Sequence, residues 1–191
     1  MLRGRLRSLV SGRISGIAAA IGVAVAAGGG EPCAQGVPGA ASAPPTRPVA
    51  LVDSSGNAAG RPFTEAIVLV TLGAVVAPAN IRPIYGADGR TASGLATWHS
   101  GGSVLFTSAD CTAGAYIHTS AHAGLRASTQ VQTEAGIVLF AGTIGPSVTE
   151  SIQSILYDTG CAPVVVRQNG LVPVVANVNL TTTYPPPLSF Q

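Results

Sequence analysis

The sequence predicts an all-β fold, with a single small antiparallel β-sandwich or barrel-like domain over residues 49–191. Short runs of branched aliphatic residues alternate there with turn residues, at a spacing typical of sandwiches and barrels. From residue 31 onward the chain has 13 serines and 16 threonines but only 14 charged residues, and threonine suits a half-solvated pleated face better than a helix. No segment after residue 48 carries a sustained helical stripe of apolar residues.

The first 27 residues have the pattern of a secretory signal peptide. Four arginines lie within the first thirteen residues, and an apolar run without charge follows over residues 17–27 and ends in small residues. Eleven residues at helical rise cover only about half of a bilayer core, so this run is too short for a permanent membrane span. The alternative is an amphipathic targeting segment or a disordered N-terminus. We expect an exported protein, located in the periplasm, on the cell surface or outside the cell.

Residues 28–48 are rich in glycine, alanine and proline, and we expect a flexible linker there. Cleavage after Ala27 would leave six arginines and eight carboxylates, a net charge of 6 − 8 = −2. Because nucleic-acid binding needs clustered cations, six scattered arginines exclude a nucleic-acid partner. The chain has no lysine, which excludes a Walker A loop and a Schiff base.

The expected strands begin at Val49 and are separated by turn residues. Asn169-Gly170 is the strongest hairpin signal in the chain, because both turn positions accept a positive φ. Residues 149–157 fit a short helix or a strand equally well. The runs that we expect to form strands are 49–53, 66–72, 74–77, 81–85, 103–108, 115–118, 136–142, 151–158, 163–167 and 171–180.

Three cysteines have to be placed in an exported chain. Cys111 and Cys161 both follow apolar runs inside the expected domain, so we expect a disulfide between them. The segment 103–111 resembles 154–161, since each has a serine, two aliphatic residues, an aromatic residue and then polar residues before its cysteine. Cys33, in the linker, would remain as a free thiol or link two chains.

His118 and His122 are the candidate metal ligands, because their i, i+4 spacing places two ligands on one face of a helix. A zincin helix would have a glutamate directly after the first histidine, where this chain has Thr119. The alternative is that both histidines are exposed loop residues. The residues that could complete such a site are His99, Asp110 and Cys111.

Trp98-His99-Ser100 suggests a serine–histidine pair, with Asp158 or Asp110 as the orienting carboxylate. The G-x-S-x-G motif of a nucleophile elbow does not occur in the chain. Asp53 with Gly56-Asn57 fits a turn better than a calcium site.

Two further features concern carbohydrate. Asn179-Leu180-Thr181 is a glycosylation sequon. Trp98 and Tyr116 are the first candidates for a platform on which sugars could stack.

The residues Asp53, Gly56 and Gly60, and then Asp110, Cys111, Thr112 and Gly114, carry a resemblance. The chain resembles uncharacterised exported bacterial β-rich proteins, which have a D-x-x-G-x-x-x-G opening hairpin and a D-C-[ST]-x-G motif at a strand end. The resemblance covers about the middle two-thirds of the chain. It implies export and a β-rich module, and it implies no particular activity or catalytic residue.

We therefore expect an exported, non-enzymatic structural or interaction module that uses no cofactor and contacts an unknown protein or glycan surface. One alternative is a small secreted hydrolase or metal-dependent enzyme that uses His99, His118 and His122. Another is a subunit of a fibre or appendage, suggested by the linker and Cys33. Homo-oligomerisation stays open.

Overall fold

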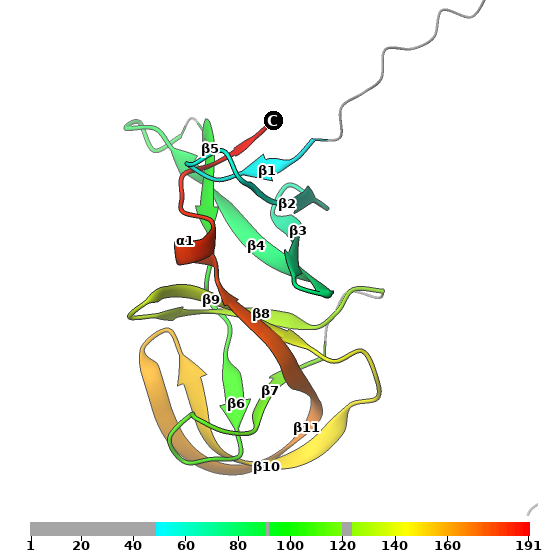
Figure 1. The fold of residues 1–191 in the computed structure, drawn as a ribbon. Coiled ribbons are helices and arrows are strands. Elements are labelled where there is room, and N and C mark those ends of the chain that lie inside the picture. Colours follow the sequence, from blue (N-terminus) through cyan, green and yellow to red (C-terminus); the bar gives the residue numbers. More distant parts are fainter. Residues whose placement is uncertain (1–48, 91, 120–123) are drawn as a thin grey trace, which may run out of the picture. The chain divides into compact units, whose positions relative to one another are not determined.

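The structure of this chain is a computed structural model that describes residues 49–90, 92–119 and 124–191. These residues form twelve β-strands and one short helix, α1 (Leu180–Thr183). The expected all-β antiparallel fold is confirmed. The strands divide into a closed barrel and a second, six-stranded sheet (Figure 1). The expected signal peptide and linker, including Cys33, lie outside the described residues.

The barrel consists of five consecutive strands and the last strand of the chain. Its order is β1-β12-β5-β4-β3-β2, and every neighbouring pair is antiparallel. The two aliphatic runs 74–77 and 81–85 belong to one strand, β4, although two separate strands were expected. The strands are β1 (Leu51–Val52), β2 (Ala58–Pro62), β3 (Ile67–Leu72), β4 (Val75–Tyr85), β5 (Ala92–Trp98) and β12 (Leu188–Phe190).

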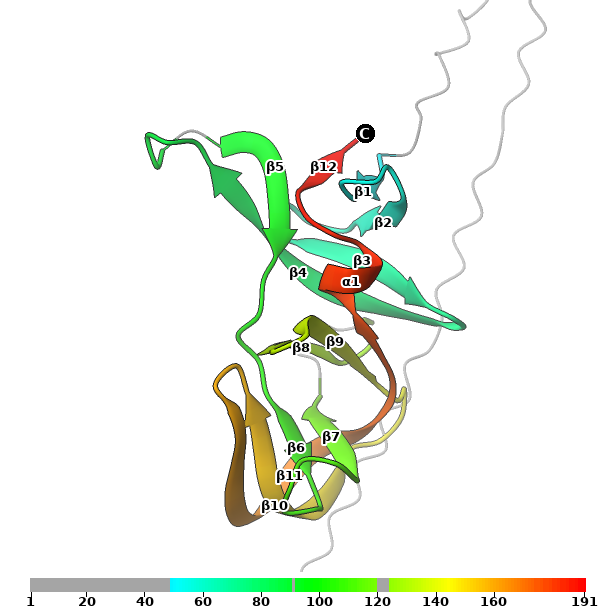
Figure 2. The same cartoon turned by 60° about the vertical axis from the view of Figure 1, so that its left-hand side comes forward.

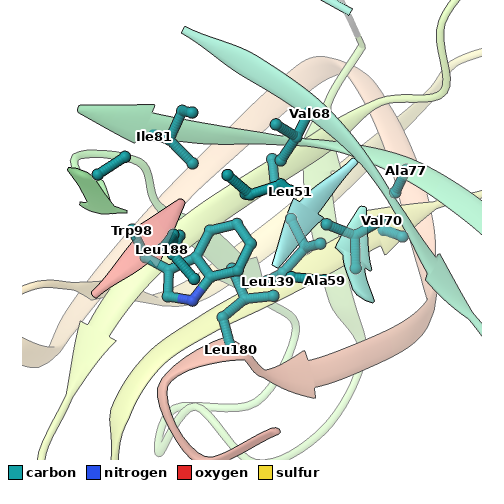
Figure 3. Close-up of a cluster of buried hydrophobic side chains, with 13 residues drawn as sticks. Leu51, Ala59, Val68, Val70, Ala77, Ile81, Trp98, Leu139, Leu180 and Leu188 are labelled. Atoms are coloured by element: carbon teal, nitrogen blue, oxygen red, sulfur yellow. The ribbon is translucent and has the colours of Figure 1, made fainter. Parts of the chain in front are cut away.

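Buried and outward-facing residues alternate along β3 and β4, and the buried side chains fill the barrel. Val68 and Val70 of β3 are fully buried, and Ala77 and Ala79 face them from β4. Residues at every second position of a strand point to one face, so these side chains form one layer. Trp98 closes the core beside Leu188, Leu139 and Leu180 (Figure 3).

The second sheet has the strand order β10-β6-β7-β11-β9-β8, and β10 also pairs with β11. Residues 149–157 lie within β10 and are therefore strand rather than helix. The strands are β6 (Val104–Phe106), β7 (Ala115–His118), β8 (Ser128–Thr133), β9 (Gly136–Gly142), β10 (Val148–Tyr157) and β11 (Gly160–Asn179).

Strand β9 contributes to two cores, and Figure 2 shows it between the barrel strands and β6, β7 and β11. Leu139 and Ala141 are fully buried in the barrel cluster. Phe140, between them in sequence, packs against a second cluster that contains Phe106 and Ile117. The continuous apolar run of β9 therefore has a simple reason: both of its faces are covered.

The hairpin expected at Asn169-Gly170 is wrong. Strand β11 continues through these residues, and the turn that joins β10 to β11 lies at Asp158-Thr159. The pairing with β10 shifts at this point, from Gln168↔Glu150 to Leu171↔Val148. Gly170 has φ +69°, so its left-handed backbone produces a β-bulge rather than a reversal of the chain.

Candidate functional site

Ser100 and Asp158 are the only pair of the expected serine, histidine and aspartate set that a hydrogen bond joins in the described chain. The Ser100 hydroxyl donates to Oδ2 of Asp158 at 2.9 Å, and the Gln132 N–H donates to Oδ1 at 2.6 Å. In a catalytic triad the histidine stands between the serine and the carboxylate. Here Ser100 donates directly to the carboxylate, and the exposed side chain of His99 is not between them. Asp158 thus ties β8 to the β10–β11 turn.

His118 is the last residue of β7 and is exposed, so it does not begin a helix. His122 lies outside the described residues. The i, i+4 argument for a shared helical face therefore does not apply to His118. Among residues 49–90, 92–119 and 124–191, no three His, Cys, Asp or Glu side chains gather as metal ligands.

The segment 107–114, which carries the D-C-T-x-G motif, is a closed loop between β6 and β7. The structure joins Cys111 to Cys161 of β11 with Cα atoms 6.0 Å apart, which is the pair expected from sequence. The Cys111 N–H donates to the hydroxyl of the fully buried Ser154 at 3.0 Å, and that hydroxyl donates to the carbonyl of Ser108 at 2.6 Å. The loop is therefore held to β10 and β11 by one covalent bond and two hydrogen bonds.

The polar residues of this motif maintain the loop. The Thr112 hydroxyl donates to Asp110 at 2.6 Å, and hydrogen bonds from the side chains of Thr112 and Ser108 hold the pKa of Asp110 below its ordinary value. A Cβ on Gly114 would lie 1.9 Å from the Thr107 hydroxyl. Each of these residues thus has a local structural role.

Asp53 has the turn role that the sequence suggested. Its Oδ1 accepts from the N–H groups of Ser55 and Asn57, both at 2.8 Å, and its Oδ2 accepts from the Asn57 side chain at 3.2 Å. Burial alone would raise the pKa of this carboxyl, but the donors of Asn57, Ser55 and Gly56 outweigh burial and hold the pKa below its ordinary value. The carboxylate completes the β1–β2 turn.

The aromatic platform expected from Trp98 and Tyr116 is wrong for Trp98. Trp98 is 2% exposed, and its indole N–H donates to the Tyr184 carbonyl at 2.9 Å. Tyr116 is half-buried against the cluster that contains Leu105. Trp98 is therefore a core residue, and a sugar cannot stack on it.

The amide of Asn179, the sequon residue, is used inside the fold. Its Oδ1 accepts from the Thr182 N–H at 3.0 Å and caps helix α1, while its Nδ2 donates to the Ala135 carbonyl at 2.7 Å. Attachment of a glycan would replace one of the two hydrogens on Nδ2, the nitrogen that holds the β8–β9 turn through the Ala135 carbonyl.

The sequence analysis missed a groove on the outside of the barrel, which we call the Arg61 groove. It has a volume of about 640 Å³, within the range typical of ligand sites. Register explains how its walls form, because Arg61 pairs with Leu69 and Thr71 pairs with Val76, so their side chains share the outer face. Three alanines complete a lining that also includes Gly60, Arg61, Leu69, Thr71, Val76 and Tyr184.

Arg61 is the only charged residue that lines this groove. In the part of the chain that the structure describes, its guanidinium makes no salt bridge or hydrogen bond. No sequence motif marks the groove. It forms because β1 and β2 are short and cover only part of the side of β3.

No family model matches this chain, and no curated protein and no solved structure matches it either. Within the described residues, no helix is both long enough and apolar enough to cross a membrane.

Proposed function

We propose that this chain is an exported, non-enzymatic β-rich module that acts by binding a partner protein or glycan through its surface. The proposed location is the periplasm, the cell surface or the extracellular space. The first 27 residues would act as the export signal, and residues 28–48 would form a flexible linker at the new N-terminus.

The observation that carries this proposal is the Cys111–Cys161 disulfide. Disulfides persist in oxidising compartments and are rare where glutathione and thioredoxin keep thiols reduced. Cys161 is exposed, so a cytosolic reductant would have access to it. The bond closes a loop of 50 residues, for which the chain-entropy model gives about 4 kcal/mol of stabilisation. The disulfide therefore supports the proposed export to an oxidising compartment.

A binding role is supported by what the polar side chains do. Asp53, Asp110 and Asp158 each accept hydrogen bonds that maintain a turn or join strands. In contrast, several large apolar side chains stand on the surface, including Val165 at 95% exposure and Ile144 at 80%. Exposed apolar side chains, together with Arg61, which has no ion-pair partner among the described residues, could contact a partner surface.

Export is tested by expressing the full chain and a variant that lacks residues 1–27 in a secreting bacterial host, and by measuring how each divides between cytosol and exported fractions. The full chain should be recovered outside the cytosol, while the truncated variant should stay inside. Equal distribution of the two would contradict the proposal.

The non-enzymatic part of the proposal is tested by metal analysis and by hydrolase assays on the purified protein. Stoichiometric metal that is lost in His118→Ala, or hydrolysis that is lost in Ser100→Ala, would replace the proposal with the enzyme alternative. We expect neither signal.

A further inference from the structure

Strand β2 leaves the side of β3 part-way along the Arg61 groove. The two strands pair only at Arg61↔Leu69 and Pro62↔Val68. On the N-terminal side of these pairs, β2 pairs with β1 instead of β3, through Leu51↔Gly60. The register of the β1–β2 pairing shifts at this point. The last three residues of β3 therefore have a ladder partner only on the β4 side in the described structure.

The backbone of Thr71 faces this opening. The Ile67 carbonyl accepts from the Phe63 N–H at 2.9 Å, so the backbone groups of Ile67 point toward β2. Because the direction of backbone groups alternates along an antiparallel strand, those of Leu69 and Thr71 point to the same side. Leu69 meets Arg61 there, but Thr71 meets no strand in the described ladder. Within the described strands, its N–H and C=O therefore have no ladder partner on the β2 side, where the groove lies.

The lining of the groove suits a small apolar chain. Ala59 and Gly60 leave room beside the backbone, while Leu69 and Val76 offer aliphatic contact. The only charged group is Arg61, whose guanidinium can hold a carboxylate through two parallel hydrogen bonds.

We propose that the Arg61 groove binds the C-terminal end of an extended apolar peptide from a partner protein. The peptide adds a short strand at Thr71, its apolar side chains lie on the small lining residues, and Arg61 holds its terminal carboxylate. A peptide is favoured over a free apolar acid because the Thr71 N–H and C=O match a peptide group, and an alkyl chain leaves them without partners. This inference rests on the proposed role as a binding module and names its partner chemistry.

The chain contains a reporter for the test. Trp98 is its only tryptophan, and its ring centroid lies 6.4 Å from that of Tyr184, which lines the groove. Occupation of the groove should therefore change the Trp98 fluorescence. The probes are the peptide acetyl-VAVV with a free carboxylate, the same peptide with a C-terminal amide, and decanoate. Titration calorimetry on the full recovered chain gives the affinities.

The free-acid peptide should bind at least tenfold more tightly than its amide. Arg61→Gln should remove that difference, while Arg82→Gln, a matched change at another exposed arginine of the barrel, should preserve it. Thr71→Pro removes this N–H without removing a bond from the β3–β4 ladder. It should lower the affinity for the peptide but not the affinity for decanoate. Circular dichroism checks that each variant is folded.

Four results would overturn the inference. They are equal affinity for acid and amide, no effect of Arg61→Gln, decanoate binding as tightly as the peptide with Thr71→Pro changing neither affinity, and absence of any binding at millimolar peptide. These results are independent of the export measurement. If the peptide does not bind, the proposed exported location is unaffected.

Discussion

A buried amide joins strand β8 of the second sheet to strand β4 of the barrel, beside the hydrogen bond that the Ser128 hydroxyl donates to the Pro78 carbonyl at 2.6 Å. Gln130 of β8 is 2% exposed; its Oε1 accepts from the Asn80 N–H, and its Nε2 donates to the Asn80 carbonyl at 3.1 Å. Asn80 lies on β4 just beyond the point where β5 ends at Trp98. The Asn80 carbonyl also accepts from the His99 N–H at 3.1 Å, so the group that depends on the glutamine side chain is the Asn80 N–H.

Replacing this amide should destabilise the fold. In Gln130→Ala the part-buried hydrogen bond from the Asn80 N–H is lost, and such a bond contributes about 0.5–1.5 kcal/mol. Gln132→Ala is the matched control, because Gln132 is on the same strand but exposed. Urea unfolding should show a lower midpoint for Gln130→Ala alone. Equal midpoints for the two variants would contradict the role assigned to Gln130.

Acid should weaken the fold partly through Asp53. Its pKa is held below the ordinary value in the folded chain, so its contribution to stability is complete above the unfolded pKa of about 3.9 and is lost as pH falls through the folded value. Asp53→Asn keeps an oxygen acceptor for Ser55 and Asn57 but does not titrate. Unfolding midpoints measured at pH 7, 4 and 3 should therefore fall less steeply for Asp53→Asn than for the native chain; parallel curves would contradict this.

Residue types alone revealed some of these roles. The turn role of Asp53 followed from its neighbours Gly56 and Asn57, and the cysteine pairing followed from their positions. The roles of Gln130 and Arg61 could not be predicted, because each depends on where distant strands end. Trp98 was misassigned for a related reason: its sequence neighbours are polar, and only the closed barrel buries it.

Among the strands, apolar runs of similar composition have different surroundings. The run in β9 is buried on both faces, whereas Val165 of β11 is 95% exposed. Both runs, 136–142 and 163–167, were expected only to form strands. Sequence identifies a strand former, but only the tertiary fold shows whether a second layer covers it.

The bulge at Gly170 can be tested by substitution. Gly170 has φ +69° and open space around its Cα, so Gly170→Ala is penalised only by its backbone, by about 1–2 kcal/mol. Gly145→Ala is the control, since Gly145 has equally open space and no positive φ. Thermal unfolding should show a lower Tm for Gly170→Ala only. A neutral Gly170→Ala would contradict the left-handed bulge.

For the second sheet as a whole, hydrogen bonds outside the strand ladder hold its β8 edge. The Gly102 N–H donates to the Gln130 carbonyl at 3.0 Å, and Asp158 accepts from the Gln132 N–H. Over residues 161–167, β11 pairs with β10 alone in the described chain. Pro163 there has no N–H to offer, and the register shift near Val165 bends the strand. Both features hinder addition of a strand at this edge.

For the whole molecule, the all-β class and its antiparallel pairing were predictable from alternating runs and turn residues. The division into a barrel and a second sheet was not, because β2, β5, β8 and β12 are short or polar and carry weak signals. The closing strand β12 also comes from the far end of the chain, a long-range pairing that local patterns do not reveal.

The central claim is that this chain is an exported module in oxidised form. The most direct test is the intact mass of the protein recovered after expression, alkylated with and without prior reduction. We predict a chain shortened by about the first 27 residues, in which Cys111 and Cys161 become alkylated only after reduction and Cys33 is either free or joins two chains. A full-length chain of 19.0 kDa with three thiols open to alkylation would contradict the account.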